Sequence, residues 1–189
     1  MTDSGSDTTG ESFGDDGRAT TERTVLRYLV TISLIGMFIL MGAATYSVAL
    51  RGWMACGGGF PKCAGSYIPL LHTPGSLSQT YTHGQILAEW FHRATAFVTG
   101  VLMLVATGLA WWRVKEFTIT RWSLTAATAV LPLEAYLGVL TGVPDPSQTL
   151  VAIHLVVSLF DLVALVIAAI ILWWSAYSGG RRGSHEAKA

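Results

Sequence analysis

Five consecutive residues, Glu89-Trp90-Phe91-His92-Arg93, place a carboxylate, an imidazole and a guanidinium in a stretch that is otherwise apolar as far as Trp112. Ionisable side chains at membrane depth are costly, so they usually mark a functional site. A second histidine, His154, lies in a similarly apolar stretch later in the chain. For either histidine alone, a ring hydrogen-bonded to a neighbouring carbonyl is an equally good interpretation.

Two such imidazoles together favour a haem site. Neutral imidazole is a good ligand for haem iron, and facing helices are where bundles build cofactor sites. A zinc or copper site would need further ligands close by, and the apolar surroundings of His92 and His154 offer few. We therefore expect His92 and His154 to be axial ligands of one haem iron.

Glu89 precedes His92 by three residues, so both lie on neighbouring positions of one helical face. A partly desolvated carboxylate there could exchange protons with a bound substrate. It could equally form an ion pair with Arg93 or a hydrogen bond to the His92 ring. Arg93 could instead bind a haem propionate, because guanidinium binds carboxylate bidentately. The residues alone leave these alternatives open.

The remaining ionisable groups are expected to be structural or exposed. Glu134 and Asp161 are the other acids in apolar stretches, and Asp161 lies on the same helical face as His154, about 10 Å deeper. A polar contact inside a bundle is the expectation for Asp161. His72 and His83 are expected at the surface, in or beside a loop.

Both cysteines, Cys56 and Cys63, fall in one Gly- and Pro-rich stretch, with no other cysteine to compete for pairing. We predict that this loop is on the oxidising side of a membrane and that the two form a disulfide. The disulfide could be structural, or it could be an exposed redox group near a haem edge.

The composition indicates a polytopic membrane protein. Of 189 residues 51% are hydrophobic and 13% charged, and several apolar runs approach the length that spans a bilayer. No basic patch with interleaved aromatic residues occurs, so nucleic acid is not an expected partner. Residues 1–23 are acidic and poor in large apolar residues, which predicts a disordered tail, and they lack the basic start of a signal peptide.

The apolar runs predict an all-α bundle of four transmembrane helices. Their expected bounds are about 25–50, 84–112, 122–143 and 148–177, with a long loop over 51–83 and a polar tail over 178–189. Pro132 is expected to kink the third helix.

Lysine and arginine near the helix ends predict that both termini are cytoplasmic. Three basic residues precede or open the first helix, three lie in 113–121 and three in the tail, whereas the 51–83 loop has only Arg51 and Lys62. The second and fourth helices then both begin at the outer face. Counted inward, His92 and His154 reach a similar depth, about 9 to 12 Å of helix.

Four ordered motifs give the chain a resemblance to the haem A synthase family of the cytochrome oxidase assembly pathway. They are C-G-x-x-[WF]-P-x-C at Cys56–Cys63, E-x-x-H-R at Glu89–Arg93, G-x-L-T-G at Gly138–Gly142 and A-x-H-L at 152–155. Typical members look like two tandem four-helix halves. This chain is similar to the N-terminal half and looks like the compact form found in some archaea.

The resemblance implies oxidation of the C8 methyl of haem O to a formyl group, which gives haem A. It also implies His92 and His154 as axial ligands, Glu89 as the group that assists proton movement or stabilises developing charge, and a haem b cofactor. A single histidine pair then suggests a homo-oligomer in the membrane lipid, with Gly138 and Gly142 as a possible helix contact, and haem O synthase is a conceivable partner.

Two other classes fit the same residues less well. One is a non-catalytic bis-histidine haem b cytochrome that transfers electrons, in which Glu89 is structural. The other is a thiol oxidoreductase that passes electrons from a disulfide to quinone. Such proteins usually relay through two cysteine pairs, and this chain has one.

Overall fold

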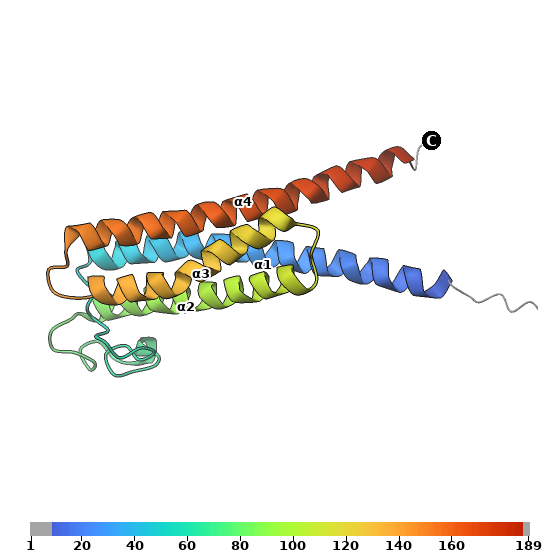
Figure 1. Cartoon of the computed structure of the whole chain (residues 1–189). Coiled ribbons are helices and arrows are strands. Elements are labelled where there is room, and N and C mark those ends of the chain that lie inside the picture. The colour runs from blue at the N-terminus through green and yellow to red at the C-terminus, as the bar shows by residue number, and fades with distance from the viewer. Residues whose placement is uncertain (1–8, 187–189) are drawn as a thin grey trace, which may run out of the picture.

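The computed structural model describes residues 9–186, with side chains described over 17–178. Four long helices account for most of this part of the chain (Figure 1). They are α1 (Thr9–Ala49), α2 (His83–Trp112), α3 (Thr118–Thr141) and α4 (Gln148–Glu186), and a short 3₁₀ helix, η1 (Pro69–Leu71), lies in the loop before α2. Each long helix contains a segment apolar enough to cross a membrane. The predicted all-α, four-helix, multi-pass membrane bundle is confirmed.

The helices pack as two antiparallel pairs, α1 with α2 and α3 with α4, and contacts between the pairs are less extensive. The 50–82 loop and the α3–α4 turn share one end of the bundle, here called the loop end (Figure 1). The described ends of α1 and α4 both point away from it, so both chain ends share one side, as predicted. That this side is cytoplasmic stays a prediction from the basic residues.

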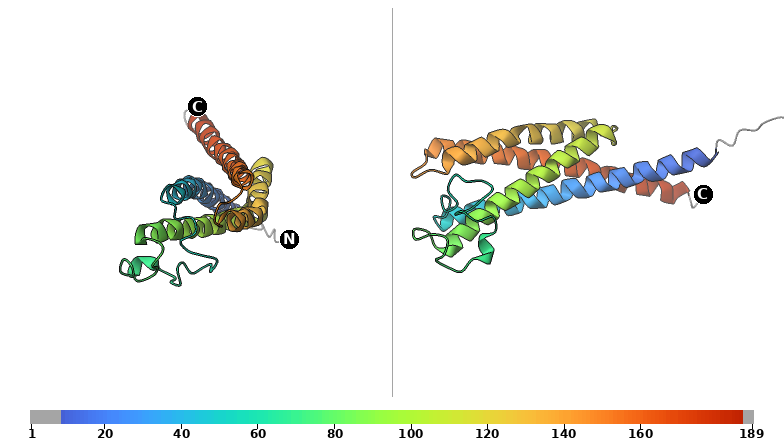
Figure 2. Two further views of the ribbon diagram at one scale, coloured as in Figure 1. Left: turned by 90° about the vertical axis from the view of Figure 1, so that its left-hand side faces the viewer. Right: turned by 90° about the horizontal axis from the view of Figure 1, so that it is seen from below.

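The apolar core lies in the half of the bundle away from the loop end. Its fully buried members include Leu26, Met103, Leu124 and Leu165, one from each helix. None of the buried residues that α2, α3 and α4 contribute to this cluster lies in the loop-end half of the bundle. Figure 2 shows the two helix pairs diverging toward the loop end. The main apolar core therefore holds the helices together at one end, and at the loop end a smaller apolar cluster around Ile86 lies beside the buried polar side chains.

Two hydrogen bonds connect the helix pairs within this apolar half. The hydroxyls of Thr107 on α2 and Thr128 on α3 are 2.7 Å apart. The Trp173 indole N–H on α4 donates to Thr31 Oγ1 on α1 at 3.0 Å. Side-chain hydrogen bonds of this kind help hold helices together where lipid provides no hydrophobic drive.

Two predicted boundaries need correction. α1 is already helical from Thr9, within the 1–23 segment predicted to be disordered, and α4 continues to Glu186, through most of the 178–189 tail. Ion pairs from Glu22 to Arg18 and Arg113, and from Arg23 to Glu116, stabilise α1 beyond its apolar part. The composition of residues 1–23 gave no sign of the ion pairs with Arg113 and Glu116, which lie between α2 and α3. Residues 1–8 lie outside the described part of the chain.

The loop-side half of α1 approaches α2 closely at Gly36. A Cβ on Gly36 would lie 2.5 Å from Thr99 Oγ1 on α2, whereas a Cβ on Gly42, one and a half turns later, would meet nothing within 4 Å. Gly36 is thus a crowded position and Gly42 an open control position on the same helix.

We expect Gly36→Leu to destabilise the α1–α2 pair by about 1–3 kcal/mol, since overpacking a close helix contact forces the backbones apart. Gly42→Leu should leave stability unchanged or raise it, because leucine favours a helix more than glycine does. Thermal unfolding of both variants in detergent measures the difference. Equal melting temperatures for the two variants would contradict the α1–α2 contact.

Candidate functional site

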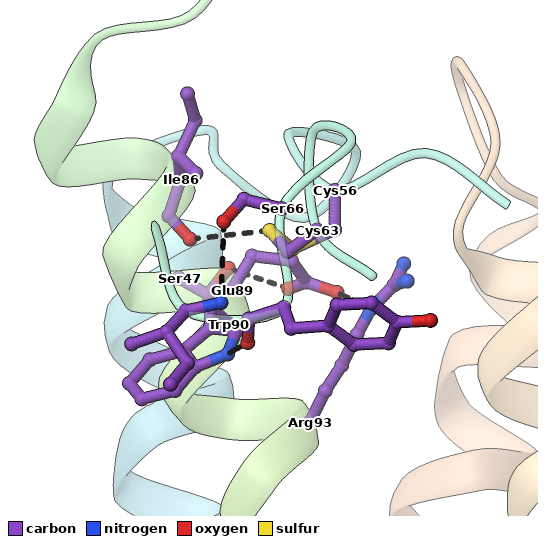
Figure 3. Close-up of a disulfide and its surroundings, with 10 residues drawn as sticks. Ser47, Cys56, Cys63, Ser66, Ile86, Glu89, Trp90 and Arg93 are labelled. Carbon is purple, nitrogen blue, oxygen red and sulfur yellow. Dashed lines mark hydrogen bonds and ion pairs between the residues drawn. A yellow bond between two sulfur atoms is a disulfide. The ribbon is translucent and has the colours of Figure 1, made fainter. Parts of the chain in front are cut away.

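Glu89 is buried at the loop end, 6% exposed, and both of its carboxylate oxygens are engaged. Ser47 on α1 donates to Oε2 at 2.9 Å, and Arg93 Nε donates to Oε1 at 2.9 Å. Figure 3 shows Glu89 between Ser47 and Arg93, below the disulfide loop in that view. Of the alternatives that the sequence left open, the ion pair with Arg93 is present. Arg93 uses Nε for this contact, which leaves its two terminal nitrogens for another anion.

His92 lies in the third turn of α2 with its ring partly buried. The ring of His92 contacts the backbone of Leu40 on α1. Its Nδ1 is buried and has no hydrogen-bond partner among the described residues. A buried ring nitrogen without a partner is costly, and it suits an atom that a bound group would engage.

His154 lies in the second turn of α4 and is held by α3. Its Nε2 is 2.8 Å from Glu134 Oε2, and Ser158, one turn further along α4, donates to the same oxygen at 3.1 Å. Thr141 Oγ1 is 3.5 Å from His154 Nδ1. Gly138 lies beside the ring, where a Cβ would be 3.8 Å from His154 Cε1. Gly138 therefore faces the inside of the bundle, which corrects its expected place at a contact with a second copy.

The structure brings the two histidines together. His92 and His154 are close enough to interact electrostatically, although they come from different helix pairs. Both helices begin at the loop end (Figure 1), and His92 and His154 lie in their third and second turns, so the two histidines are at similar depth. Among the described residues no group of three or more His, Cys, Asp or Glu side chains could hold a metal ion. Both ring nitrogens of His154 lie against side chains of α3, Nε2 near Glu134 and Nδ1 near Thr141, whereas Nδ1 of His92 has no partner among the described residues.

Asp161 lies deeper in the bundle and is fully buried, and neither carboxylate oxygen has a hydrogen-bond partner among the described residues. It interacts electrostatically with Glu134. The polar contact expected for Asp161 inside the bundle is thus an interaction with another acid, Glu134.

The disulfide between Cys56 and Cys63 is present and buried, with the two residues 5% and 1% exposed. Cys63 Sγ lies 3.6 Å from the Ile86 carbonyl oxygen on the first turn of α2 (Figure 3). Both cysteines also pack with Ala55 and Ile86. The exposed disulfide considered from the sequence is therefore not what the structure shows. Burial against α2 favours the structural role over thiol exchange, which requires access.

Further contacts hold the loop on α2. A Cβ on Gly52 would lie 2.9 Å from the Gln85 carbonyl oxygen, and Gln85 Nε2 donates to the Leu50 carbonyl at 2.8 Å. Gln85 also forms a capping box with Thr82 at the start of α2. The Trp90 indole N–H donates to the Tyr67 carbonyl at 3.0 Å. The loop thus covers the turns of α2 that carry Glu89 and His92.

Other residues fall at the edge of the site or outside it. His72 is exposed in the loop, where its Nε2 lies 3.0 Å from Ser66 Oγ, and His83 begins α2 with a buried, unpartnered Nδ1. Neither is brought to His92 and His154 by any described contact. Sequence reasoning missed Ser47 and Ser158 entirely, and it did not connect Glu134 to His154. The spacing of Ser158 four residues after His154 was the one available signal.

Comparison with known proteins gives a consistent family. The chain is 26% identical to a heme A synthase of Bacillus licheniformis over 148 residues, 78% of this chain and 44% of that protein. It is 22% identical over 152 residues to a heme A synthase of Geobacillus kaustophilus and 25% identical over 149 residues to one of Bacillus pumilus; these alignments cover 80% and 78% of this chain, and 44% and 45% of those proteins. The chain is a distant relative of the haem A synthases.

The chain spans less than half the length of these haem A synthases. The predicted resemblance to this family is confirmed as a distant one, and the four motifs that suggested it lie on α2, α3, α4 and the loop before α2. No family model matches the chain, and no solved structure matches it.

We expect Cys56→Ser/Cys63→Ser to lower stability by roughly 2–3 kcal/mol and to loosen the loop, because the disulfide closes a short ring that is buried against α2. Limited proteolysis between residues 51 and 82, together with the melting temperature in detergent, measures both effects. Ser76→Ala, at an exposed position of the same loop, should change neither. Unaltered proteolysis of the double variant would argue against a structural disulfide.

Proposed function

We propose that this protein oxidises the C8 methyl of haem O to a formyl group, giving haem A for terminal oxidase assembly. The observation that supports this most strongly is the pairing of two inward histidines from α2 and α4 with a buried carboxylate one turn from His92. The similarity to haem A synthases supports a haem as the substrate class.

The described residues fit a haem. His92 offers a buried ring nitrogen with no partner, and no residue of the apolar core cluster from α2, α3 or α4 is buried in the half of the bundle where the two histidines lie. We assign His92 and His154 as the residues that would hold the iron, and the terminal nitrogens of Arg93 as a propionate partner. When bound, haem iron supplies the redox chemistry that the side chains lack.

Glu89 is assigned to the chemical step. Its carboxylate is fixed by Ser47 and Arg93 and needs no reorganisation to face charge that develops on a nearby carbon. The conversion of methyl to formyl removes four electrons, which must pass to an external oxidant, and adds one oxygen atom from water or O2. The same carboxylate can accept a proton that leaves the methyl carbon. The loop above Glu89 limits access of bulk water to this point.

The described residues contain one such histidine pair, and the reaction in the proposed form requires both a haem b cofactor and the substrate haem O. We therefore propose a homo-oligomer in the membrane, in which one copy holds haem b and another holds haem O. Haem O synthase is proposed as the protein that delivers the substrate. A detergent-purified monomer with a single haem that still converts haem O would exclude this arrangement.

Co-expression with a haem O supply, followed by haem extraction and mass analysis, tests the activity. We expect haem A in the wild type and its loss in His92→Ala and His154→Ala. Glu89→Gln should keep the haem content and lower haem A formation by about 10²–10⁴-fold, the usual contribution of a positioned acid–base group. His72→Ala, which changes an exposed loop histidine, serves as the matched control and should retain activity.

The outcomes separate the proposal from its main rival. Bound haem without any haem A product, and a Glu89→Gln variant with unaltered spectra, would identify a bis-histidine electron-transfer cytochrome instead. Absence of haem in a folded wild-type protein would exclude both functions.

A further inference from the structure

We propose that the 50–82 loop lies on the membrane itself: Phe60, Leu70 and Leu71 enter the lipid of the leaflet at the loop end, and Lys62 binds the phosphate of an anionic phospholipid there. This inference is independent of the proposed function, because it concerns where the loop lies and not the chemistry of the site.

Exposed aromatic side chains mark the opposite edge of the membrane. They lie away from the loop end, come from all four helices and are Tyr28, Trp111, Trp112, Trp122, Trp173 and Trp174. The rings of Tyr28 and Trp173 contact each other, as do those of Trp111 and Trp122, so residues of different helices share a level. Tryptophan and tyrosine prefer the level of the lipid headgroups. We call these six residues the aromatic belt.

The edge at the loop end follows from the thickness of a bilayer. The hydrocarbon core is about 30 Å thick, which a helix crosses in about 20 residues. Counted from Tyr28, this length ends one residue before Ala49, the last residue of α1. Counted from Trp122, it ends one residue after Thr141, the last residue of α3. Both helices therefore end where a bilayer that begins at the aromatic belt would end.

The loop backbone lies at this edge. On α2, the same length counted from Trp111 ends at Phe91. The Trp90 indole N–H, from the residue before Phe91, donates to the carbonyl oxygen of Tyr67 at 3.0 Å. The loop therefore returns to the membrane surface at Tyr67 instead of standing above it in water.

The loop folds back along the flank of α2 that faces away from α4, as Figures 1 and 2 show, and η1 packs on that helix. The ring of Phe60 lies 6.1 Å, centroid to centroid, from the ring of Phe97. Phe97 is six residues beyond Phe91, about 9 Å further into the bilayer. Phe60 is 58% exposed and Leu71, in η1, 78%. Large apolar side chains that are exposed at this level are covered by lipid.

The irregular backbone limits how far the loop can enter. Unpaired N–H and C=O groups are excluded from the hydrocarbon core, where neither water nor protein satisfies them. We therefore place the backbone of the loop among the headgroups, with only its apolar side chains among the acyl chains. Amphipathic segments that lie on a membrane surface are arranged in the same way.

The charge of the loop suits an anionic headgroup. Residues 50–82 contain Arg51 and Lys62 and no aspartate or glutamate. Lys62 is exposed, lies over the Tyr67 ring at 5.0 Å from its centre, and lines a shallow hollow together with Ser66. Because the Tyr67 backbone is at the membrane edge, the Lys62 ammonium lies at the level of the lipid phosphates. A phosphate in the hollow would meet an ammonium group and a hydroxyl.

The first test measures depth with a nitroxide spin label on the full-length protein in phosphatidylcholine vesicles that contain phosphatidylglycerol. The two native cysteines are joined, so an added cysteine is the one reactive thiol. A label at Leu71→Cys should collide more with oxygen, which concentrates among acyl chains, than with a water-soluble nickel chelate. Leu70→Cys is a second labelled position. Gln79→Cys is the matched control, exposed in the same loop but close to the start of α2, about 12 Å beyond Phe91, and should show the reverse preference.

A Leu71 label that collides mainly with nickel, as at Gln79, would place the loop in water and overturn the proposal. A label shielded from both reagents would also overturn it, because protein, such as a second copy of the chain, would then cover η1.

The second test titrates phosphatidylglycerol into phosphatidylcholine vesicles and follows the oxygen preference of the Leu71 label. We expect this preference to rise with phosphatidylglycerol. In Lys62→Gln the fraction that gives half of the effect should increase about fivefold, the usual contribution of one basic residue near an anionic membrane. Lys115→Gln is the charge-matched control, exposed between α2 and α3 at the opposite edge, and should behave as the wild type.

The same half-effect fraction in Lys62→Gln and the wild type would overturn the assignment of Lys62 to a headgroup. Inorganic phosphate added to pure phosphatidylcholine vesicles should not reproduce the rise. If it did, the hollow would be a site for free anions, and the lipid assignment would be wrong.

Discussion

A charged side chain inside a membrane bundle is costly unless it has a partner within the protein, and two such pairings organise the loop end of the molecule. Glu89 on α2 is satisfied by Ser47 on α1, and Glu134 on α3 by His154 on α4. These polar contacts join the same helices that pack most extensively as pairs. The two carboxylates therefore stabilise the helix pairs, and the same contacts hold the candidate site residues in position.

The two halves of the bundle have different roles. Apolar side chains from all four helices meet in the half away from the loop and hold the pairs together there. Toward the loop end the pairs diverge (Figure 2), and buried or half-buried histidines and acids lie there beside a smaller apolar cluster. A rigid apolar base of this kind lets the other half tolerate polar groups, because the energetic cost of burying them is offset by packing elsewhere.

The loop before α2 belongs to the site more closely than its composition suggests. Its glycines and prolines indicate an irregular segment, yet Cys63 and Gly52 contact the backbone of α2 directly, within one turn of Glu89. The disulfide fixes the loop against the helix that carries Glu89 and His92. Positioning of that carboxylate thus depends on a covalent bond that lies outside the membrane helices.

The order and number of the helices could be predicted from the sequence, since apolar runs of spanning length are a local property of the chain. The ends of α1 and α4 could not, because both helices continue past their apolar runs into polar segments, where apolar periodicity gives no signal.

For the site, the sequence by itself determined the residue types: two imidazoles at similar depth, an acid three residues before one of them, and a pair of cysteines. Only the tertiary structure decided which atoms meet. Ser47 and Arg93 bind Glu89; Glu134 and Ser158 contact His154, and the disulfide is buried. The physical reason is that spacing along one helix sets which face a side chain lies on, whereas its partners come from other helices, whose rotation and offset are set by packing.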